Sequence, residues 1–304
     1  MAPARSRSCQ TRRFTILDMD MDSPRAPLVT FVTVNYKMSH HIRHLLAGVE
    51  QAAFAFPFEY ILVDNASGDG IADMVRERFP WVRVIESPKN VGYGAGNNIA
   101  LREAKSEFVL LFNPDLTVFP GEVESWIEWM RARPDVGISG PRVLNPDGSD
   151  QDSCYRFPNV LTPILRRTFL GRLPFARSVN ERYVMKEMDR NVEQDVDWVL
   201  GAAMLIRKTT LDTIGLFDER FFMYFEEADI CRRVWSAGLR VTYAPVARFV
   251  HYHGRESRIR FPWEIVTNKL TRIHMASGFK YFLKHFGSRN PRTVSLSNPR
   301  VNAL

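Results

Sequence analysis

The chain has 304 residues, of which 45% are hydrophobic and 25% are charged, a composition typical of a soluble globular protein. Its three cysteines are odd in number and widely spaced, which argues against a disulfide framework, and a cytoplasmic location is expected. The sequence contains no apolar run of membrane-spanning length, and residues 1–27 lack the apolar core of a secretory signal and are expected to form a disordered tail.

The net charge of +7 is concentrated at one end of the chain. From residue 258 onward there are nine Lys or Arg and one acid, which leaves the rest of the chain at −1. A basic end attached to a neutral body predicts an anionic partner for that end, either a membrane or a nucleic acid.

The first 85 residues show strands and helices in alternation. Apolar, β-branched runs at 28–34, 59–63 and 81–85 predict strands, and helical periodicity at 40–53 and 71–79 predicts helices between them. This order predicts an α/β fold with a mostly parallel central sheet flanked by helices.

A fully apolar run at 108–112 predicts a further buried strand, which Pro114 ends. Asp115 therefore follows the carboxyl end of a sheet strand, the edge at which open α/β sheets bind ligands. It is a candidate metal ligand, and the alternative is that it only caps a turn.

Three glycines at 90–98 precede a predicted helix at 99–105 and would let the backbone approach a phosphate, although a flexible loop is the alternative. Residues 150–195 are expected to be an irregular insertion with a short helix at 161–173. A strand at 196–206 carries small residues at its centre, which allow the close approach of a ligand or another backbone.

Three acids, Glu226, Glu227 and Asp229, crowd the first turn of a helix that follows an aromatic stretch. An ion pair with Arg233 accounts for Asp229. Glu226 and Glu227 border the core face, where desolvation would raise a carboxylate pKa and create a base near neutral pH. Two extended runs, 239–244 and 246–250, lead to His251, which could assist a metal that a carboxylate already holds.

These stretches together resemble the family-2 glycosyltransferases, and most closely their rhamnosyltransferase-like branch, over roughly residues 28–257. The matching segments are 32–36, 63–67, 90–98, 113–115, 198–201, 217–224, 226–229 and His251. The resemblance implies a GT-A fold, a nucleoside diphosphate sugar donor, a divalent cation (Mg²⁺ or Mn²⁺), and inversion at the sugar carbon. A hydroxyl of a glycan or lipid-linked acceptor in cell-envelope polysaccharide synthesis would receive the sugar, with rhamnose as a candidate.

The resemblance also implies roles for individual residues. Seven residues would bind the donor: Thr33, Asn35, Asp64, Asn90, Asn97, Asn113 and Trp198. Asp115 would hold the metal with help from His251, although the usual Asp-x-Asp motif is Asn-Pro-Asp here. Glu227 stands at the position of the base, and whether Glu226 or Glu227 takes the proton is left open.

Residues 258–304 form a predicted basic, amphipathic C-terminal extension to the 28–257 catalytic domain. Its interleaved aromatic and basic residues, such as Phe261, Trp263 and Lys280, favour a peripheral anchor on the cytoplasmic face of an anionic membrane. A helix packed on the body is the alternative, and no nucleic-acid motif accompanies the charge.

Two other functions compete with glycosyl transfer. A nucleotidyltransferase would carry a glycine-rich basic loop after the first strand, where this chain has Asn35-Tyr36-Lys37. A catalytically inactive nucleotide-sugar binding module would not need Asp115, Glu227 and His251 together.

Overall fold

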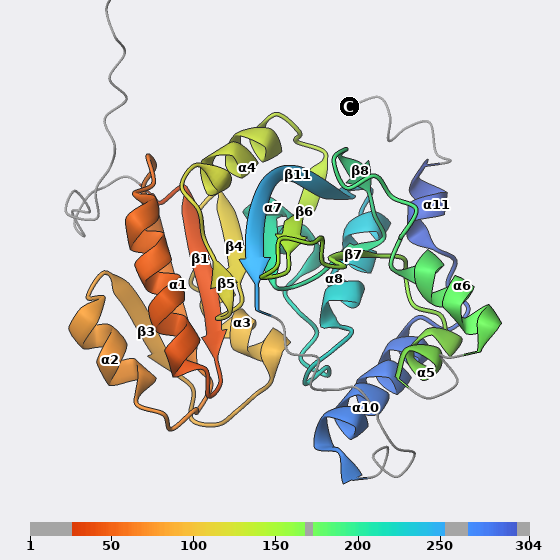
Figure 1. Cartoon of the computed structure of the whole chain (residues 1–304), viewed down its shortest axis with the longest axis horizontal. Coiled ribbons are helices and arrows are strands. Elements are labelled where there is room, and N and C mark those ends of the chain that lie inside the picture. Colours follow the sequence, from red (N-terminus) through yellow and green to blue (C-terminus); the bar gives the residue numbers. More distant parts are fainter. Residues whose placement is uncertain (1–25, 168–172, 253–266, 297–304) are drawn as a thin grey trace, which may run out of the picture.

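The computed structural model describes residues 26–167, 173–252 and 267–296, and its main feature is a nine-stranded sheet (Figure 1). The strands run in the order β3-β2-β1-β4-β10-β6-β11-β5, and β8 also pairs with β11. They are β1 (Val29–Asn35), β2 (Phe58–Asp64), β3 (Val82–Glu86), β4 (Phe108–Phe112), β5 (Leu116–Thr117), β6 (Val136–Leu144), β8 (Gln194–Asp195), β10 (Ala203–Arg207) and β11 (Arg240–His251). A separate ribbon pairs β7 (Cys154–Tyr155) with β9 (Trp198–Val199).

The predicted mostly parallel sheet is confirmed. Strand β1 lies parallel to β2 and β4, β2 lies parallel to β3, and β6 lies parallel to β11. Strand β10 is the exception in the middle of the sheet, because it runs antiparallel to both β4 and β6.

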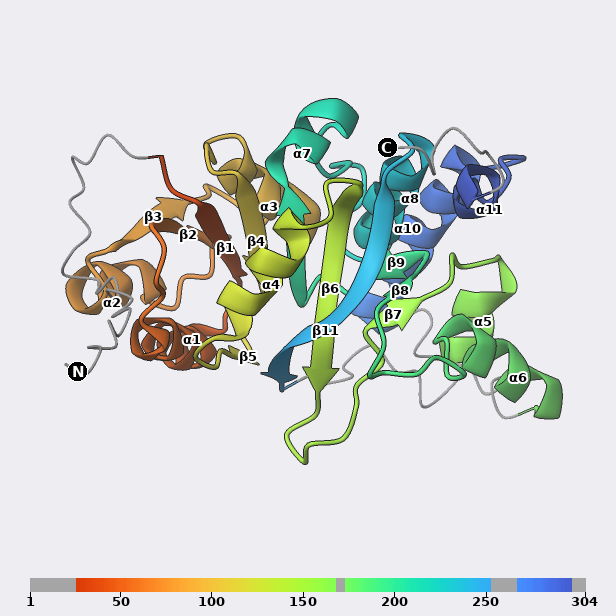
Figure 2. The ribbon, with the colours of Figure 1, turned by 90° about the horizontal axis from the view of Figure 1, so that it is seen from above.

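Helices cover both faces of the sheet (Figure 2). They are α1 (Ser39–Ala52), α2 (Ile71–Arg78), α3 (Tyr93–Leu101), α4 (Glu122–Arg131), α5 (Leu161–Arg167), α6 (Pro174–Tyr183), α7 (Lys208–Ile214), α8 (Glu226–Ser236), α10 (Lys269–Lys284) and α11 (Pro291–Leu296). Successive strand residues face opposite sides, so Phe31 packs in the core with α1 and α4, whereas Val32 packs in the core with α3, α7 and α8. Burial on both faces explains why the strands are continuous apolar runs.

Three predicted elements differ from the structure. The helix predicted at 99–105 begins at Tyr93, so Gly94 and Gly96 lie inside it. The strand predicted at 196–206 is divided into β9 and β10, which belong to different sheets. The runs at 239–244 and 246–250 form one strand, β11, with an irregularity between Ala244 and Arg248 at which its register shifts against β6.

The insertion at 150–195 contains two helices, α5 and α6, where one was predicted. The predicted C-terminal helical extension is present as α10 and α11. Residues 1–25 of the predicted disordered tail (1–27), and Phe261 and Trp263 of the extension, lie outside the described residues.

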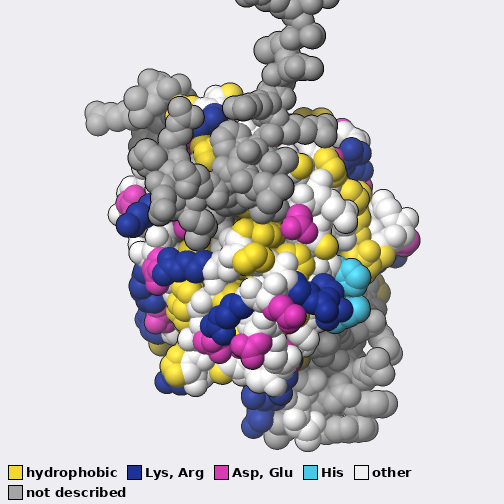
Figure 3. Space-filling model, turned by 90° about the vertical axis from the view of Figure 1, so that its left-hand side faces the viewer, with side chains coloured by type: hydrophobic (Ala, Val, Ile, Leu, Met, Phe, Trp, Pro, Cys, Tyr) yellow, Lys and Arg dark blue, Asp and Glu magenta, His cyan; other side chains and the backbone are white. Residues whose placement is uncertain are grey.

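Strand β3 is one edge of the sheet, and its exposed side chains are charged. Arg83 of β3 forms an ion pair with Glu103, and Glu86 pairs with Arg76 of α2. Figure 3 shows this end of the molecule with acidic and basic side chains interspersed. Such charges prevent an edge strand from pairing with another chain.

Candidate functional site

The carboxyl ends of β1 and β2 lie side by side, with Asn35 opposite Asp64. Both side chains are buried, and both bind Ser67: Asn35 Nδ2 donates to Ser67 Oγ (2.8 Å), and Ser67 N donates to Asp64 Oδ1 (3.1 Å). The predicted donor residues Asn35 and Asp64 are therefore held together at the ligand-binding edge of the sheet.

Asn65, which was part of a matching segment but received no predicted role, connects this edge to the glycine-rich segment. Its Nδ2 donates to Asn90 Oδ1 and to the Gly92 carbonyl (both 3.1 Å), and its Oδ1 accepts from Val91 N (2.9 Å). Asn65 thus places Asn90, another predicted donor residue, beside Asp64.

The glycines of this segment serve close packing. Gly92 has φ 91°, and a Cβ there would lie 2.0 Å from the Phe222 carbonyl oxygen, which accepts a hydrogen bond from Tyr93 N. A Cβ on Gly96 would lie 2.9 Å from Val34 of β1. The glycines let α3 approach the sheet and the loop before α8. This close packing explains why glycine occupies these positions, and no bound phosphate is needed to explain it.

Two of the predicted donor residues are buried and make hydrogen bonds within the protein. Thr33 is fully buried, and its hydroxyl bonds to Tyr60 Oη (2.7 Å) and to the Phe112 carbonyl (2.9 Å). Asn97 is 1% exposed and donates to the Tyr93 carbonyl in its own helix. These contacts position β1 and α3.

The other two predicted donor residues lie beyond the end of β4 and in the β7–β9 ribbon. The Asn113 N–H donates to the Ala202 carbonyl (2.8 Å). Trp198 stacks on Tyr155 with ring centroids 4.3 Å apart and donates from Nε1 to the Arg156 carbonyl. Trp198 also borders the core that contains the loop before α8.

Asp115 and His251 meet at the carboxyl edge, as the metal-site prediction requires. His251 Nε2 lies 3.2 Å from Asp115 Oδ1, and Tyr252 N donates to the Asp115 carbonyl. Burial tends to raise the pKa of Asp115, but the hydrogen bond and charge of His251 outweigh burial and leave that pKa below its ordinary value. The carboxylate is therefore ionised at neutral pH.

Gln151 orients the His251 ring from a segment 100 residues away. Gln151 Nε2 donates to Asn145 Oδ1 (3.0 Å), so its Oε1 is the acceptor that lies 2.7 Å from His251 Nδ1. This hydrogen bond consequently places a proton on Nδ1 and holds the ring with Nε2 toward Asp115.

The oxygen and nitrogen of this pair fit adjacent positions around a divalent cation. Two neighbouring ligands at about 2.1 Å from an octahedral cation lie about 3 Å apart. Among the described residues, no group of three or more His, Cys, Asp or Glu side chains could hold a metal. A cation at Asp115 and His251 would thus take most of its ligands from a bound diphosphate and water.

The acid pair begins α8, immediately after two residues in the left-handed region, Tyr224 (φ 75°) and Phe225 (φ 71°). Glu226 is 1% exposed, and its Oε2 has no hydrogen-bond partner in the part of the chain that the structure describes. Burial, and then the charge of Glu227, raise the pKa of Glu226 well above its ordinary value, which favours the protonated acid.

Glu227 is less buried than Glu226 and lies beside Gly201. Burial raises its pKa, although backbone hydrogen bonds from its own residue and from Gly201 partly oppose the increase. A carboxylate with a raised pKa that remains accessible has the properties of a general base.

Tyr93, which was part of a matching segment but received no predicted role, links these groups. Its hydroxyl donates to the Gly201 carbonyl (2.6 Å). Burial, followed by the charges of Glu227, Glu226 and Asp115, raises its pKa well above the ordinary value. The phenol therefore stays protonated between the acid pair and the predicted metal site.

We expect Gly201→Ala to lower turnover by about tenfold or more, because a Cβ at Gly201 would lie 3.0 Å from both Cγ and Oε1 of Glu227 and 2.9 Å from Tyr93 Oη. Initial rates with saturating donor would measure the loss. Gly48→Ala in α1 is the control, since its Cβ would meet only ordinary contacts of 3.7 Å or more and should leave activity unchanged. Equal rates for both variants would show that Glu227 does not need its present position.

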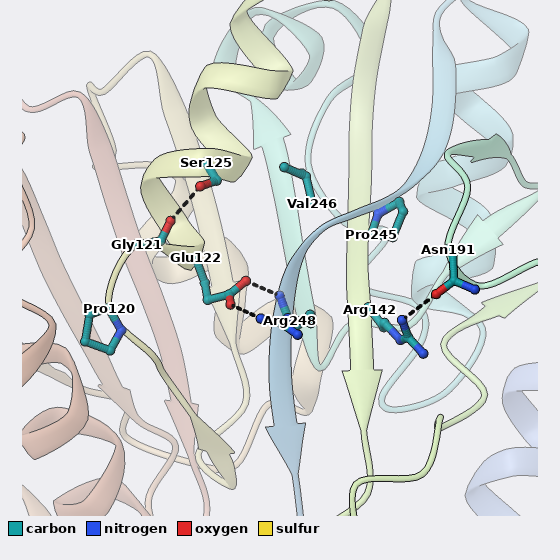
Figure 4. Close-up of a pocket in the computed structure, with 9 residues that line it drawn as sticks. All are labelled: Pro120, Gly121, Glu122, Ser125, Arg142, Asn191, Pro245, Val246 and Arg248. Carbon is teal, nitrogen blue, oxygen red and sulfur yellow. Dashed lines mark hydrogen bonds and ion pairs between the residues drawn. The ribbon is translucent and has the colours of Figure 1, made fainter.

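A surface groove of about 470 Å³ lies elsewhere, between the start of α4 and strands β6 and β11 (Figure 4). Its two arginines are already paired, Arg142 with Asp150 and Asn191, and Arg248 with Glu122. None of its nine lining residues is a predicted site residue. The candidate site is therefore the carboxyl edge of the sheet and not this groove.

Known proteins with similar sequences and structures agree with this arrangement. Residues 30–214 match the family described as Glycosyl transferase family 2. The chain is 28% identical over 235 residues to the N-acetylglucosaminyl-diphospho-decaprenol L-rhamnosyltransferase of Mycobacterium tuberculosis, covering 73% of this chain and 75% of that protein. It is also 28% identical over 203 residues to Rhamnosyltransferase WbbL of Escherichia coli, covering 64% and 70%.

Among solved structures, the mannosyltransferase PcManGT from Pyrobaculum calidifontis, in complex with GDP-Man and Mn²⁺, superposes with a TM-score of 0.54. It is 18% identical in sequence, and the match covers 92% of this chain and 71% of that chain. This likeness shows the GT-A fold. With the match over residues 30–214, it follows that the chain is a glycosyltransferase that belongs to glycosyl transferase family 2, in its rhamnosyltransferase-like branch.

Proposed function

We propose that this protein transfers a sugar, with rhamnose as the candidate, from a nucleoside diphosphate donor to a hydroxyl of a lipid-linked glycan in cell-envelope polysaccharide synthesis. The observation that carries the proposal is the Asp115–His251 pair, which lies at the sheet edge that also holds Asn35, Asp64 and Asn90. The named activities of the rhamnosyltransferase relatives support the sugar and the acceptor class.

The donor would lie along the carboxyl edge of the sheet. Asn35, Asp64 and Asn90 would bind the nucleoside end, where hydrogen bonds through Ser67 and Asn65 hold them in place. Asp115 and His251 would hold a Mg²⁺ or Mn²⁺ ion, which when bound would neutralise the charge of the diphosphate leaving group.

Transfer would proceed as a single displacement with inversion at the sugar carbon. Glu227 would accept the proton of the acceptor hydroxyl as its oxygen bonds to the sugar carbon, while the bond to the diphosphate breaks and the diphosphate keeps the electron pair. The raised pKa of the buried Glu226 would make Glu227 the member of the pair that ionises first, and Tyr93 would hold the Gly201 backbone that contacts Glu227.

A donor screen tests the proposal. Purified protein should be stabilised against heat by one of a set of UDP-, GDP- and dTDP-linked sugars in the presence of Mn²⁺, and should hydrolyse that donor slowly without acceptor. Release of pyrophosphate from a nucleoside triphosphate would instead indicate a nucleotidyltransferase. Stabilisation by a donor without hydrolysis or transfer would indicate an inactive binding module.

We expect Gln151→Leu to weaken Mn²⁺ binding by about 10- to 100-fold, because the variant loses the acceptor that keeps the proton on His251 Nδ1. Titration of Mn²⁺ in the presence of nucleoside diphosphate, followed by electron paramagnetic resonance, measures this directly. Gln194→Leu is the control, because Gln194 in β8 bonds to the Asp189 carbonyl and lies outside the site. The same Mn²⁺ affinity in both variants would contradict the role of Gln151.

A further inference from the structure

Helix α10 has two apolar faces, and one of them packs on the loop that leads to Glu226 and Glu227. Ser277 Oγ donates to the Met223 carbonyl (2.9 Å), and a Cβ on Gly278 would lie 3.2 Å from the Phe225 ring. Tyr281, which is 1% exposed, packs on Phe225 as well. The sequence left open a helix packed on the body as the alternative to a membrane anchor, and the inner face of α10 packs in this way.

Polar contacts reinforce the inner face. Lys284 forms ion pairs with Asp218 (2.7 Å) and with the fully buried Asp229 (2.6 Å), and His285 bonds to the same Asp229 carboxylate (2.9 Å). Asp229 also pairs with Arg233, as predicted. Helix α10 is thus attached firmly to the first turn of α8.

The outer face of α10 carries a stripe of exposed apolar side chains. The members of this outer stripe are Met275 (55% exposed), Phe279 (71%), Leu283 (67%) and Phe286 (89%). Their spacing of four, four and three residues places them on one side of the helix and of its continuation. Four large apolar side chains in a row are more than the isolated exposed residues that a protein surface normally carries.

The C-terminal segment that carries the outer stripe has charges of one sign only in its own sequence. Residues 267–296 contain six Lys or Arg and no Asp or Glu. Lys269, Arg272 and Arg289 are exposed. An apolar stripe on a basic helix matches the chemistry of an anionic lipid surface, where aliphatic and aromatic groups enter the acyl boundary and bases meet headgroups.

The same charge disfavours a second copy of the chain as the partner. A symmetric dimer through α10 would bring two such basic surfaces together without acids on the helix to compensate them. The helix has 16 residues, about 24 Å in length, and no described helix is long and apolar enough to cross a bilayer. A helix of this length can lie in the plane of the membrane–water interface.

We infer that the outer stripe of α10 docks on an anionic membrane surface. The inner face of the same helix holds the loop that presents Glu227, so docking would bring the base close to the interface. This inference deepens the proposed function and rests on it in one respect: membrane docking would aid transfer only if the acceptor is lipid-linked. Its test uses no measurement of activity, so the two can fail separately.

Flotation with lipid vesicles tests the docking. The full chain should float with vesicles of equal parts phosphatidylcholine and phosphatidylglycerol at low salt, and should remain at the bottom with phosphatidylcholine alone. Raising the salt to about 1 M should weaken flotation, because screening removes the charge attraction. Equal flotation with both vesicle types, or with neither, would overturn the inference.

Point substitutions locate the surface without removing the inner face of α10. The double variant Phe279→Ser, Leu283→Ser should bind vesicles at least about tenfold more weakly, with an unchanged melting temperature because both side chains are exposed. The control is Phe119→Ser, Val246→Ser, two residues with exposures of 39% and 41% that lie outside α10, and it should float like the unmodified chain.

Two results of the substitutions would contradict the inference. Flotation of the α10 double variant at the level of the control would show that the outer stripe does not bind lipid. Analytical ultracentrifugation that revealed a dimer abolished by the same substitutions would assign the outer stripe to a second copy of the chain instead.

Discussion

Asp115→Asn should abolish measurable transfer, a loss of about 10³-fold or more. The substitution removes the only carboxylate of the proposed cation site, and the charge stabilisation that a cation supplies to a diphosphate leaving group amounts to several kcal/mol. Mn²⁺ titration in the presence of nucleoside diphosphate should show a matching loss of metal affinity.

The fold of this variant should persist. Asparagine has nearly the shape of aspartate, and the backbone carbonyl of residue 115 still accepts the hydrogen bond from Tyr252 N. Asp147→Asn, in an exposed turn, is the matched control and should retain full activity. Turnover of Asp115→Asn at the unmodified rate with saturating metal would remove Asp115 from the metal site.

Glu227→Gln should lower turnover by roughly 10² or more while donor binding is retained, as the loss of a general base requires. The assignment of the base to Glu227 rests on accessibility, because Glu226 is 1% exposed whereas Glu227 is the more open of the two. Single-turnover rates with bound donor separate this loss from any change in donor affinity.

The pH dependence provides a second measurement of the same role. Because the pKa of Glu227 is raised, turnover of the unmodified enzyme should increase with pH through a range above that of an ordinary glutamate. Glu227→Gln should lose this increase. A larger loss for Glu226→Gln than for Glu227→Gln would exchange the two roles.

Glu226→Gln is the matched control for the base and should keep most of the activity, since glutamine has nearly the shape of the protonated acid that burial favours. The pKa of Glu226 is higher in the folded than in the unfolded chain, so its contribution to stability is present at low pH and is lost as the pH rises through the folded value. The Gln variant cannot ionise, so its melting temperature relative to the unmodified chain should increase as the pH rises above the ordinary range of a glutamate.

Local patterns were sufficient for the class of the fold. The continuous apolar run of β4 and the β-branched residues of β1 predicted buried strands, because burial on both faces demands apolar residues at every position. The same reasoning could not foresee that 196–206 divides between two sheets. Strand pairing depends on partners far away in the sequence, here β4 for β10 and β7 for β9.

For the site, the sequence identified the residues that carry charge at element ends, Asp64, Asp115, Glu226, Glu227 and His251, since a carboxylate or imidazole at such a position has a limited set of uses. It could not identify Gln151, whose partner lies 100 residues away. It also could not assign roles to Asn65 and Tyr93, whose partners lie 25 and 108 residues away. An uncharged side chain takes such a role only because of the residues that folding brings beside it, and the sequence does not show which residues these are.

The sequence by itself determined an α/β protein with a mostly parallel sheet, a set of ionisable residues at its carboxyl edge, and a basic, apolar C-terminal segment. Only the tertiary structure decided that Glu226 is buried deeper than Glu227, and that α10 packs one apolar face on the catalytic loop and exposes the other. Both outcomes depend on burial, and burial is a property of the whole packed chain, because distant segments must come together before any side chain is removed from water.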